Sequence, residues 1–126
     1  MAMDEVTKAP VLVVSARWQT RALLAGELGE RVARDVVSVA SVNEALALVK
    51  LGGVDPAVVV VDAGQSMGPA DVERLLAAKR EVPLILVVSR LRRDAFDGLQ
   101  ERCAAYLVRP VRIGEVAEAV VGAAVK

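Results

Sequence analysis

The chain has 126 residues, with 16 basic and 16 acidic side chains and no histidine. This length suits one domain that buries a core without disulfides or metals. The balanced charge does not attract nucleic acid or an anionic membrane, and aromatic residues, at 2%, are too few for a base-stacking platform. The lack of histidine excludes histidine-dependent catalysis, phosphohistidine and histidine metal ligands.

Other motifs for catalysis and targeting are missing as well. Neither GxxxxGK nor GxGxxG occurs, and the single cysteine, Cys103, excludes a CxxC pair and an intramolecular disulfide. The sequence contains no cleavable signal segment and no apolar run of roughly 20 residues. We therefore expect a cytoplasmic protein that is not an enzyme and binds neither membrane nor nucleic acid. We expect residues 1–10 to form a polar leader and residues 11–126 a single domain.

Short apolar runs alternate with amphipathic segments along the chain. In chain order the predicted elements are a strand at 11–16, a helix at 17–32, a strand at 35–41, a helix from 42 to 49, a strand at 56–64, a helix beginning at 69, a strand at 81–90, a helix at 92–102, a strand at 104–111 and a helix at 113–125. Ser41 and Glu44 form a capping box, and Pro69 stands at a first helical position. Trp18 lies on the helical apolar spacing, which predicts that it packs in the core.

The strand runs contain little polar alternation, which is typical of strands buried on both faces of a parallel sheet. Five strands and five helices in alternation predict one α/β domain with helices on both faces of the sheet. The run 58–61 places Asp62 at the carboxyl end of the third strand, the edge where such sheets bind ligands. An aspartate that only caps the following turn is an equally common interpretation.

The order and endings of these strands resemble the receiver domain of two-component response regulators, over nearly the whole chain. Asp62 falls at the family's phosphoacceptor position, and Ser89 at its phosphoryl-contacting hydroxyl. Tyr106 falls on the switch aromatic, and Arg109 replaces the lysine of the family's V-K-P. The resemblance implies a flavodoxin-like, three-layer α/β/α fold with a five-stranded parallel sheet in the order 2-1-3-4-5 and five helices.

The departures from the family concern its metal site. Phosphorylated members carry two acidic residues after the first strand, which hold Mg²⁺ together with the aspartate. Ser15 and Ala16 stand there instead, so that acidic pocket is degraded. Asp62 and the Gly64 carbonyl are weak ligand candidates, whereas Mg²⁺ prefers an octahedral set of oxygens with carboxylates. We expect no metal and no other cofactor. Mg²⁺ is expected to bind only under the alternative in which Asp62 is phosphorylated.

A buried Asp62 needs a charged partner. We predict a standing contact with Arg109, because a guanidinium group binds carboxylates in a bidentate manner. The resemblance also implies a cis peptide before Pro110. For Ser89 and Tyr106, a strand-end hydroxyl and a half-buried ring are the favoured interpretation over a retained switch.

These features favour a degenerate receiver, or pseudo-receiver, that acts in bacterial signalling through protein contacts without normal Mg²⁺-dependent phosphorylation. The alternative is a working stand-alone receiver that a histidine kinase or phosphorelay partner phosphorylates on Asp62. A flavodoxin-like cofactor binder is the weakest alternative, because residues 15–20 have no glycine for a phosphate loop.

The expected partners are signalling proteins, such as a histidine kinase or an output protein. Arginines gather around the ends of the fourth and fifth strands, as a solvated face or a surface for an acidic partner. The last helix carries more apolar residues than one core-facing stripe needs. The surplus is compatible with a homodimer contact along the face of the fourth and fifth helices.

Overall fold

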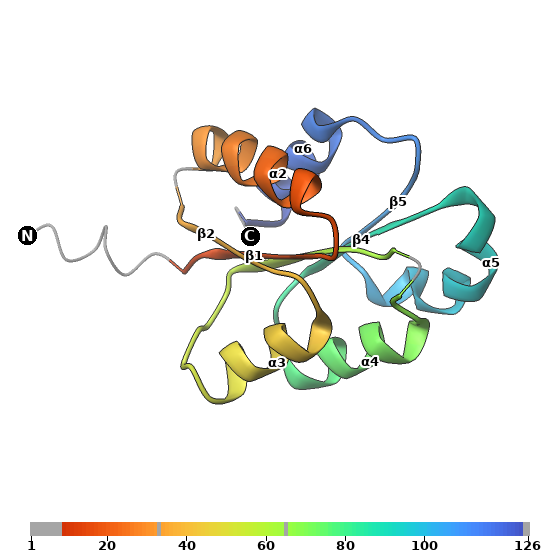
Figure 1. Ribbon diagram of the computed structural model, residues 1–126, viewed down its shortest axis with the longest axis horizontal. Helices are drawn as coiled ribbons and strands as arrows, with labels where there is room; N and C mark the ends of the chain where they lie inside the picture. Colours follow the sequence, from red (N-terminus) through yellow and green to blue (C-terminus); the bar gives the residue numbers. More distant parts are fainter. Residues whose placement is uncertain (1–8, 33, 65, 125–126) are drawn as a thin grey trace, which may run out of the picture.

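In the computed structural model of the chain, residues 9–32, 34–64 and 66–124 are described. They contain one parallel sheet with the strand order β2-β1-β3-β4-β5, so the predicted flavodoxin-like fold is confirmed (Figure 1). The strands are β1 (Val11–Ser15), β2 (Val36–Val39), β3 (Val58–Asp62), β4 (Leu84–Val88) and β5 (Ala105–Val108). The central strands β1, β3 and β4 are buried along their whole length, in agreement with their unbroken apolar runs.

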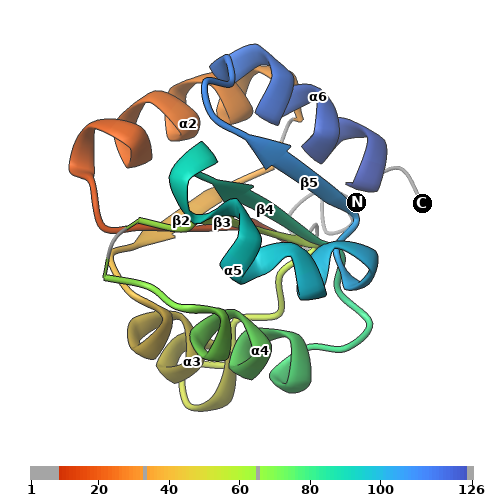
Figure 2. The same ribbon diagram turned by 90° about the vertical axis from the view of Figure 1, so that its right-hand side faces the viewer.

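Helices cover both faces of the sheet, which gives three layers (Figure 1). The helices are α2 (Trp18–Arg31), α3 (Val42–Lys50), α4 (Pro69–Ala78), α5 (Arg93–Phe96) and α6 (Ile113–Ala124). Helices α2 and α6 lie on one face, and α3, α4 and the segment around α5 lie on the other (Figure 2). Two separate cores result, because alternate side chains of each strand point to opposite faces: Leu12 packs toward α3 and α4, and Val13 toward α2 and α6.

The predicted helix ends have the expected local chemistry. The Ser41 hydroxyl accepts a hydrogen bond from the Glu44 amide at 3.1 Å, and the Glu44 carboxylate accepts one from the Ala40 amide at 2.9 Å. Pro69 begins α4, and the Asp71 carboxylate accepts a hydrogen bond from the Gly68 amide at 3.0 Å. These caps set the direction in which the chain leaves the sheet edge after β2 and β3.

The fourth helical segment differs from the single helix predicted at 92–102. It consists of a 3₁₀ turn, η1 (Arg90–Arg92), one α-helical turn, α5, and a second 3₁₀ stretch, η2 (Asp97–Arg102). Glycine at position 98 weakens a regular helix, and the segment is anchored mainly by the buried side chains of Phe96 and Leu99. The segment still covers its face of the sheet, so the layer arrangement is unchanged.

Some predictions fall on parts of the chain outside the described residues. The expected polar leader at 1–10 is described only at its last two residues, and the predicted end of the last helix at 125 lies outside as well. Within the described ranges, no helix combines the length and apolar character that a membrane crossing needs.

Candidate functional site

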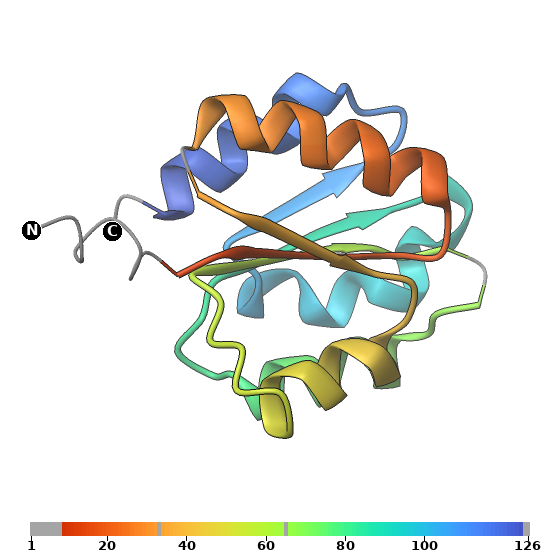
Figure 3. The same cartoon turned by 60° about the vertical axis from the view of Figure 1, so that its left-hand side comes forward.

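The carboxyl ends of the strands meet at one edge of the sheet, on the right in Figures 1 and 3. Ser15 ends β1 and Asp62 ends β3, and the parallel register places the two residues directly opposite each other. They are the buried polar residues of the described chain, with exposures of 0% and 4%. A buried carboxylate is strongly destabilising unless it is paired, so its contacts decide the chemistry of this edge.

Three side chains contact the Asp62 carboxylate. The Ser15 hydroxyl donates a hydrogen bond to Oδ2 at 2.7 Å, and the Arg17 guanidinium lies 3.7 Å from the same oxygen. The Arg109 guanidinium forms an ion pair with Oδ1. The predicted contact between Asp62 and Arg109 is therefore confirmed, and both carboxylate oxygens have partners.

Arg109 reaches Asp62 from the end of β5. Its amide donates a hydrogen bond to the Val88 carbonyl at 2.9 Å, which extends the ladder between β4 and β5 by one residue. The following peptide bond, to Pro110, is cis, as predicted. Burial lowers the pKa of the Arg109 guanidinium, and the nearby positive charge of Arg17 lowers it further. Arginine stays charged despite such a shift, so the pair with Asp62 is ionic.

Two more arginines bind backbone carbonyls of the same edge. The Arg21 guanidinium donates a hydrogen bond to the Ser15 carbonyl at 2.7 Å. The Arg92 guanidinium donates one to the Gly64 carbonyl and also stacks over the Phe96 ring, 5.2 Å from its centroid. Guanidinium groups thus contact the strand-end carboxylate and two carbonyls of adjacent loops.

This donor set does not suit Mg²⁺, which needs several oxygens free to coordinate it in an octahedral arrangement. Asp62 supplies the carboxylate, but Ser15 and two arginines bind it. The Gly64 carbonyl is bound by Arg92, and Ala16 contributes no side-chain oxygen. Among the described residues there is no group of three acidic, cysteine or histidine side chains that could hold a metal ion.

Ser89 lies at this edge after β4, whereas Tyr106 lies further back, as the second residue of β5. Ser89 follows β4 and precedes η1 without a side-chain cap hydrogen bond. The Tyr106 hydroxyl lies 3.0 Å from an Asp97 carboxylate oxygen and 3.2 Å from the Arg93 carbonyl, on the side of the fourth helical segment. Desolvation, followed by the hydrogen bond and charge of Asp97, raises the pKa of Tyr106 to about 12.

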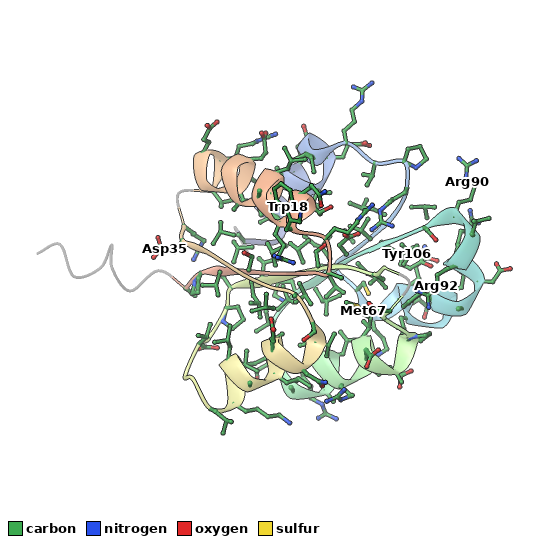
Figure 4. The ribbon with its side chains drawn as sticks, viewed as in Figure 1. Trp18, Asp35, Met67, Arg90, Arg92 and Tyr106 are labelled. Atoms are coloured by element: carbon green, nitrogen blue, oxygen red, sulfur yellow. The ribbon has the colours of Figure 1, made fainter. Side chains whose placement is uncertain are left out.

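The sequence placed Arg92 only in the arginine cluster around the ends of the fourth and fifth strands, and it did not identify Arg17 and Arg21 as site residues. Arg17 and Arg21 belong to the segment after β1, where an arginine at the start of a helix carries no distinctive pattern. The predicted core position of Trp18 is wrong: the side chain is 66% exposed at the start of α2, because Leu24 and Leu28 form the buried side of this helix (Figure 4). Arg90 lies at the outer rim in the same view, whereas Arg92 lies closer to the sheet edge.

The fold of the chain is similar to that of solved receiver domains. The receiver domain of NtrX from Brucella abortus matches with a TM-score of 0.76 at 17% identity, over 92% of this chain and 98% of that chain. A response regulator receiver domain protein from Clostridium thermocellum matches with a TM-score of 0.71 at 19% identity, over 93% and 94%. The chain has the receiver fold.

A protein that is named as an enzyme has a similar fold. The crystal structure of an adenylate cyclase from Rhodopirellula baltica matches with a TM-score of 0.80 at 16% identity, over 93% of this chain and 87% of that chain. No protein-family model matches the sequence. A search of curated proteins finds no match. At identities of 16–19% the structural likeness describes the fold and leaves function to the site residues.

Proposed function

We propose that the chain is a pseudo-receiver: a receiver-fold module of bacterial signal transduction that acts through protein–protein contacts, without Mg²⁺-dependent phosphorylation of Asp62. The observation that carries the proposal is the set of partners on the Asp62 carboxylate. Ser15 stands where a metal-binding acid stands in the family and donates a hydrogen bond to Oδ2, and Arg109 pairs with Oδ1.

These contacts work against phosphoryl transfer in two ways. A carboxylate oxygen that attacks phosphorus must give up a hydrogen bond or an ion pair, which raises the barrier to the reaction. The transferring phosphoryl group also needs positive charge fixed around it, which Mg²⁺ supplies in most phosphoryl-transfer sites. Here the arginines offer positive charge, but two of them are committed to the nucleophile itself. Transfer to Asp62 is therefore expected to be slow or absent.

A receiver fold that does not depend on phosphorylation acts through its surface. Arg90, Arg93 and Arg112 are exposed around the ends of β4 and β5. Clustered exposed arginines favour fast association with acidic surfaces, so an acidic signalling protein is the partner class we propose. A homodimer along the α5–α6 side is a further proposal, and a histidine kinase or an output protein is the kind of signalling protein that we propose as the partner.

A working receiver is the alternative, and one observation favours it. Asp62 lies at the carboxyl end of β3, with Ser89 at the end of β4 and Tyr106 on β5, so the three positions of the family's switch are all retained. Under this alternative, Mg²⁺ and a phosphodonor displace the arginines from Asp62.

Intact-protein mass spectrometry after incubation with acetyl phosphate and Mg²⁺ tests the proposal. We expect the wild-type mass to stay unchanged, as in the control Asp62→Asn, which lacks the carboxylate at position 62. In parallel, amide NMR shifts are followed during titration with Mg²⁺ and then with beryllofluoride, an acyl-phosphate mimic. A phosphorylated fraction that Asp62→Asn lacks, or saturable Mg²⁺-dependent shifts around Asp62, would replace the proposal with the working receiver.

A further inference from the structure

A cavity of about 530 Å³ opens at the carboxyl edge of the sheet, the edge that faces the viewer in Figure 2. The residues that line it include Arg17, Arg92, Arg109, Ser66, Ser89 and Leu91. Asp62 lines a different and smaller cavity, of about 210 Å³, on the α2–α6 side of the arginines. A molecule in the larger cavity would therefore meet guanidinium groups and hydroxyls before it meets the carboxylate.

The charges around the larger cavity do not balance. Arg17, Arg92 and Arg109 contribute three positive charges, and Asp62 behind them contributes one negative charge, which leaves an excess of two positive charges. Burial is the main cause of the lowered pKa of Arg109, and the positive charge of Arg17 lowers that pKa further. An anion between the guanidinium groups would relieve the repulsion.

We propose that this cavity is a metal-free binding site for a small phosphate monoester, held without a covalent bond. The guanidinium groups of Arg17, Arg92 and Arg109 bind its phosphate group, and the Ser89 hydroxyl, which is not used in a helix cap, donates a further hydrogen bond. A dianionic phosphate matches the excess of two positive charges. Its three terminal oxygens accept more hydrogen bonds than the two oxygens of a carboxylate do.

The size and lining of the cavity point to an organic phosphate. About 530 Å³ lies in the range of small-molecule sites and greatly exceeds the room that a bare phosphate needs. Leu91 lines the cavity with a side chain that is 96% exposed, and an apolar portion of the ligand would cover it. The proposal rests on the proposed function, because a Mg²⁺-dependent receiver would place the phosphoryl group on Asp62.

The site also has a physical connection to the rest of the surface. Arg92 belongs to η1 and stacks on Phe96, which is buried under the fourth helical segment. The Tyr106 hydroxyl lies within hydrogen-bond distance of Asp97, the residue that follows Phe96. A ligand that draws Arg92 away from the Gly64 carbonyl would therefore act on the segment that presents the exposed arginines Arg90 and Arg93.

Calorimetric and amide NMR titrations with phenyl phosphate and inorganic phosphate, in EDTA and at constant ionic strength, test the proposal. We expect saturable binding of phenyl phosphate, tighter than that of inorganic phosphate, with shifts around Gly64, Ser89 and Arg92. Arg92→Gln should weaken binding about tenfold or more, since it removes a charged hydrogen-bond donor. Arg17→Gln changes a largely exposed side chain and should weaken binding similarly. Arg90→Gln, which removes the same charge outside the cavity lining, is the matched control and should bind as the wild type does.

Asp62→Asn separates this proposal from the proposed function. It removes the negative charge that competes for Arg17 and Arg109, so phenyl phosphate should bind at least as tightly as to the wild type. Absence of saturable binding in EDTA, or an equal loss in Arg90→Gln and Arg92→Gln, would overturn the phosphate site and leave the pseudo-receiver proposal intact. Binding that requires both Mg²⁺ and Asp62 would overturn both proposals.

Discussion

The two halves of the carboxyl edge use polar groups in opposite ways. At the ends of β1 and β3, Ser15 and Asp62 are buried and hydrogen-bonded to each other. Arg17 and Arg109 form ion pairs with the Asp62 carboxylate. On the side of β4 and β5, Ser89 lines an open cavity, and the Tyr106 hydroxyl lies at the surface near Asp97. In the first half both oxygens of the buried carboxylate have partners, whereas the second half contains hydroxyl groups that are available to ligands or partners.

This difference shows how one fold keeps a site while changing its chemistry. The position of Asp62 follows from the strand order, which the fold fixes. Its reactivity depends on which side chains surround it, and guanidinium groups on Asp62 and the Gly64 carbonyl leave few oxygens for a metal. The fold alone is therefore a poor guide to function here, and the side chains at the strand ends are the better guide.

The largest effect should come from removing Arg109. In Arg109→Met the buried Asp62 loses its ion pair on Oδ1, and the free energy of unfolding should fall by about 3 kcal/mol, the lower end for a broken buried pair because Ser15 and Arg17 remain. Urea denaturation followed by circular dichroism measures this. Arg90→Met, at an exposed position, is the control and should change stability by less than about 0.5 kcal/mol. Equal losses in both variants would contradict the view that Arg109 compensates the buried charge of Asp62.

A smaller loss should follow from Ser15→Ala. This change deletes the 2.7 Å hydrogen bond to Asp62 at a fully buried position, so unfolding should become easier by about 1 to 2 kcal/mol. The same denaturation experiment reports it. Combining Ser15→Ala with Arg109→Met should be non-additive, since both side chains contact one carboxylate; simple additivity would mean that the two contacts act independently.

On the side of β4 and β5, the ionisation of Tyr106 is a direct probe of its contact with Asp97. It is the chain's single tyrosine, so tyrosinate absorbance near 295 nm reports on it alone. The folded midpoint should lie at about 12, with Asp97→Asn moving it toward the ordinary value of 10.0. Because the unfolded chain releases this proton first, the contribution of Tyr106 to stability is complete below pH 10 and is lost as the pH rises toward 12. A folded midpoint at 10 would show that Tyr106 is not held near Asp97.

The smallest effect should belong to Ser89→Ala. The hydroxyl makes no helix-cap hydrogen bond and lines a cavity, so the free energy of unfolding should change by less than about 0.5 kcal/mol. The informative comparison is with Ser15→Ala, which is the same substitution at the end of a different strand. If Ser89→Ala is as destabilising as Ser15→Ala, the Ser89 hydroxyl makes a stabilising contact comparable to that of Ser15.

Several features of this protein were predictable from local sequence. Unbroken valine runs identified the central strands, and the Ser41–Glu44 capping box and Pro69 marked two helix starts. The resemblance of the strand endings to receiver domains supplied the sheet order and the cis peptide before Pro110. These features depend on hydrophobic periodicity, capping and turn geometry, which act over a few residues and leave a readable pattern.

The contact between Asp62 and Arg109 was predictable for a different reason. A buried carboxylate needs a cation, and the resemblance placed both groups at the same edge. By contrast, Trp18 fitted the helical spacing yet is exposed, because periodicity does not fix where an amphipathic stripe ends. The fourth helical segment also fitted one helix, but the chain forms three short turns there, with Phe96 and Leu99 buried in the core.

What only the tertiary structure decided is the arginine environment of the site. Arg17, Arg92 and Arg109 come from three segments far apart in the sequence, and long flexible side chains leave no periodic pattern that would predict their targets. The sequence by itself determined the order of strands and helices and the position of Asp62, because burial and local backbone chemistry act on neighbouring residues. The partners of that carboxylate depended on how distant loops meet at the sheet edge, which folding alone brings about.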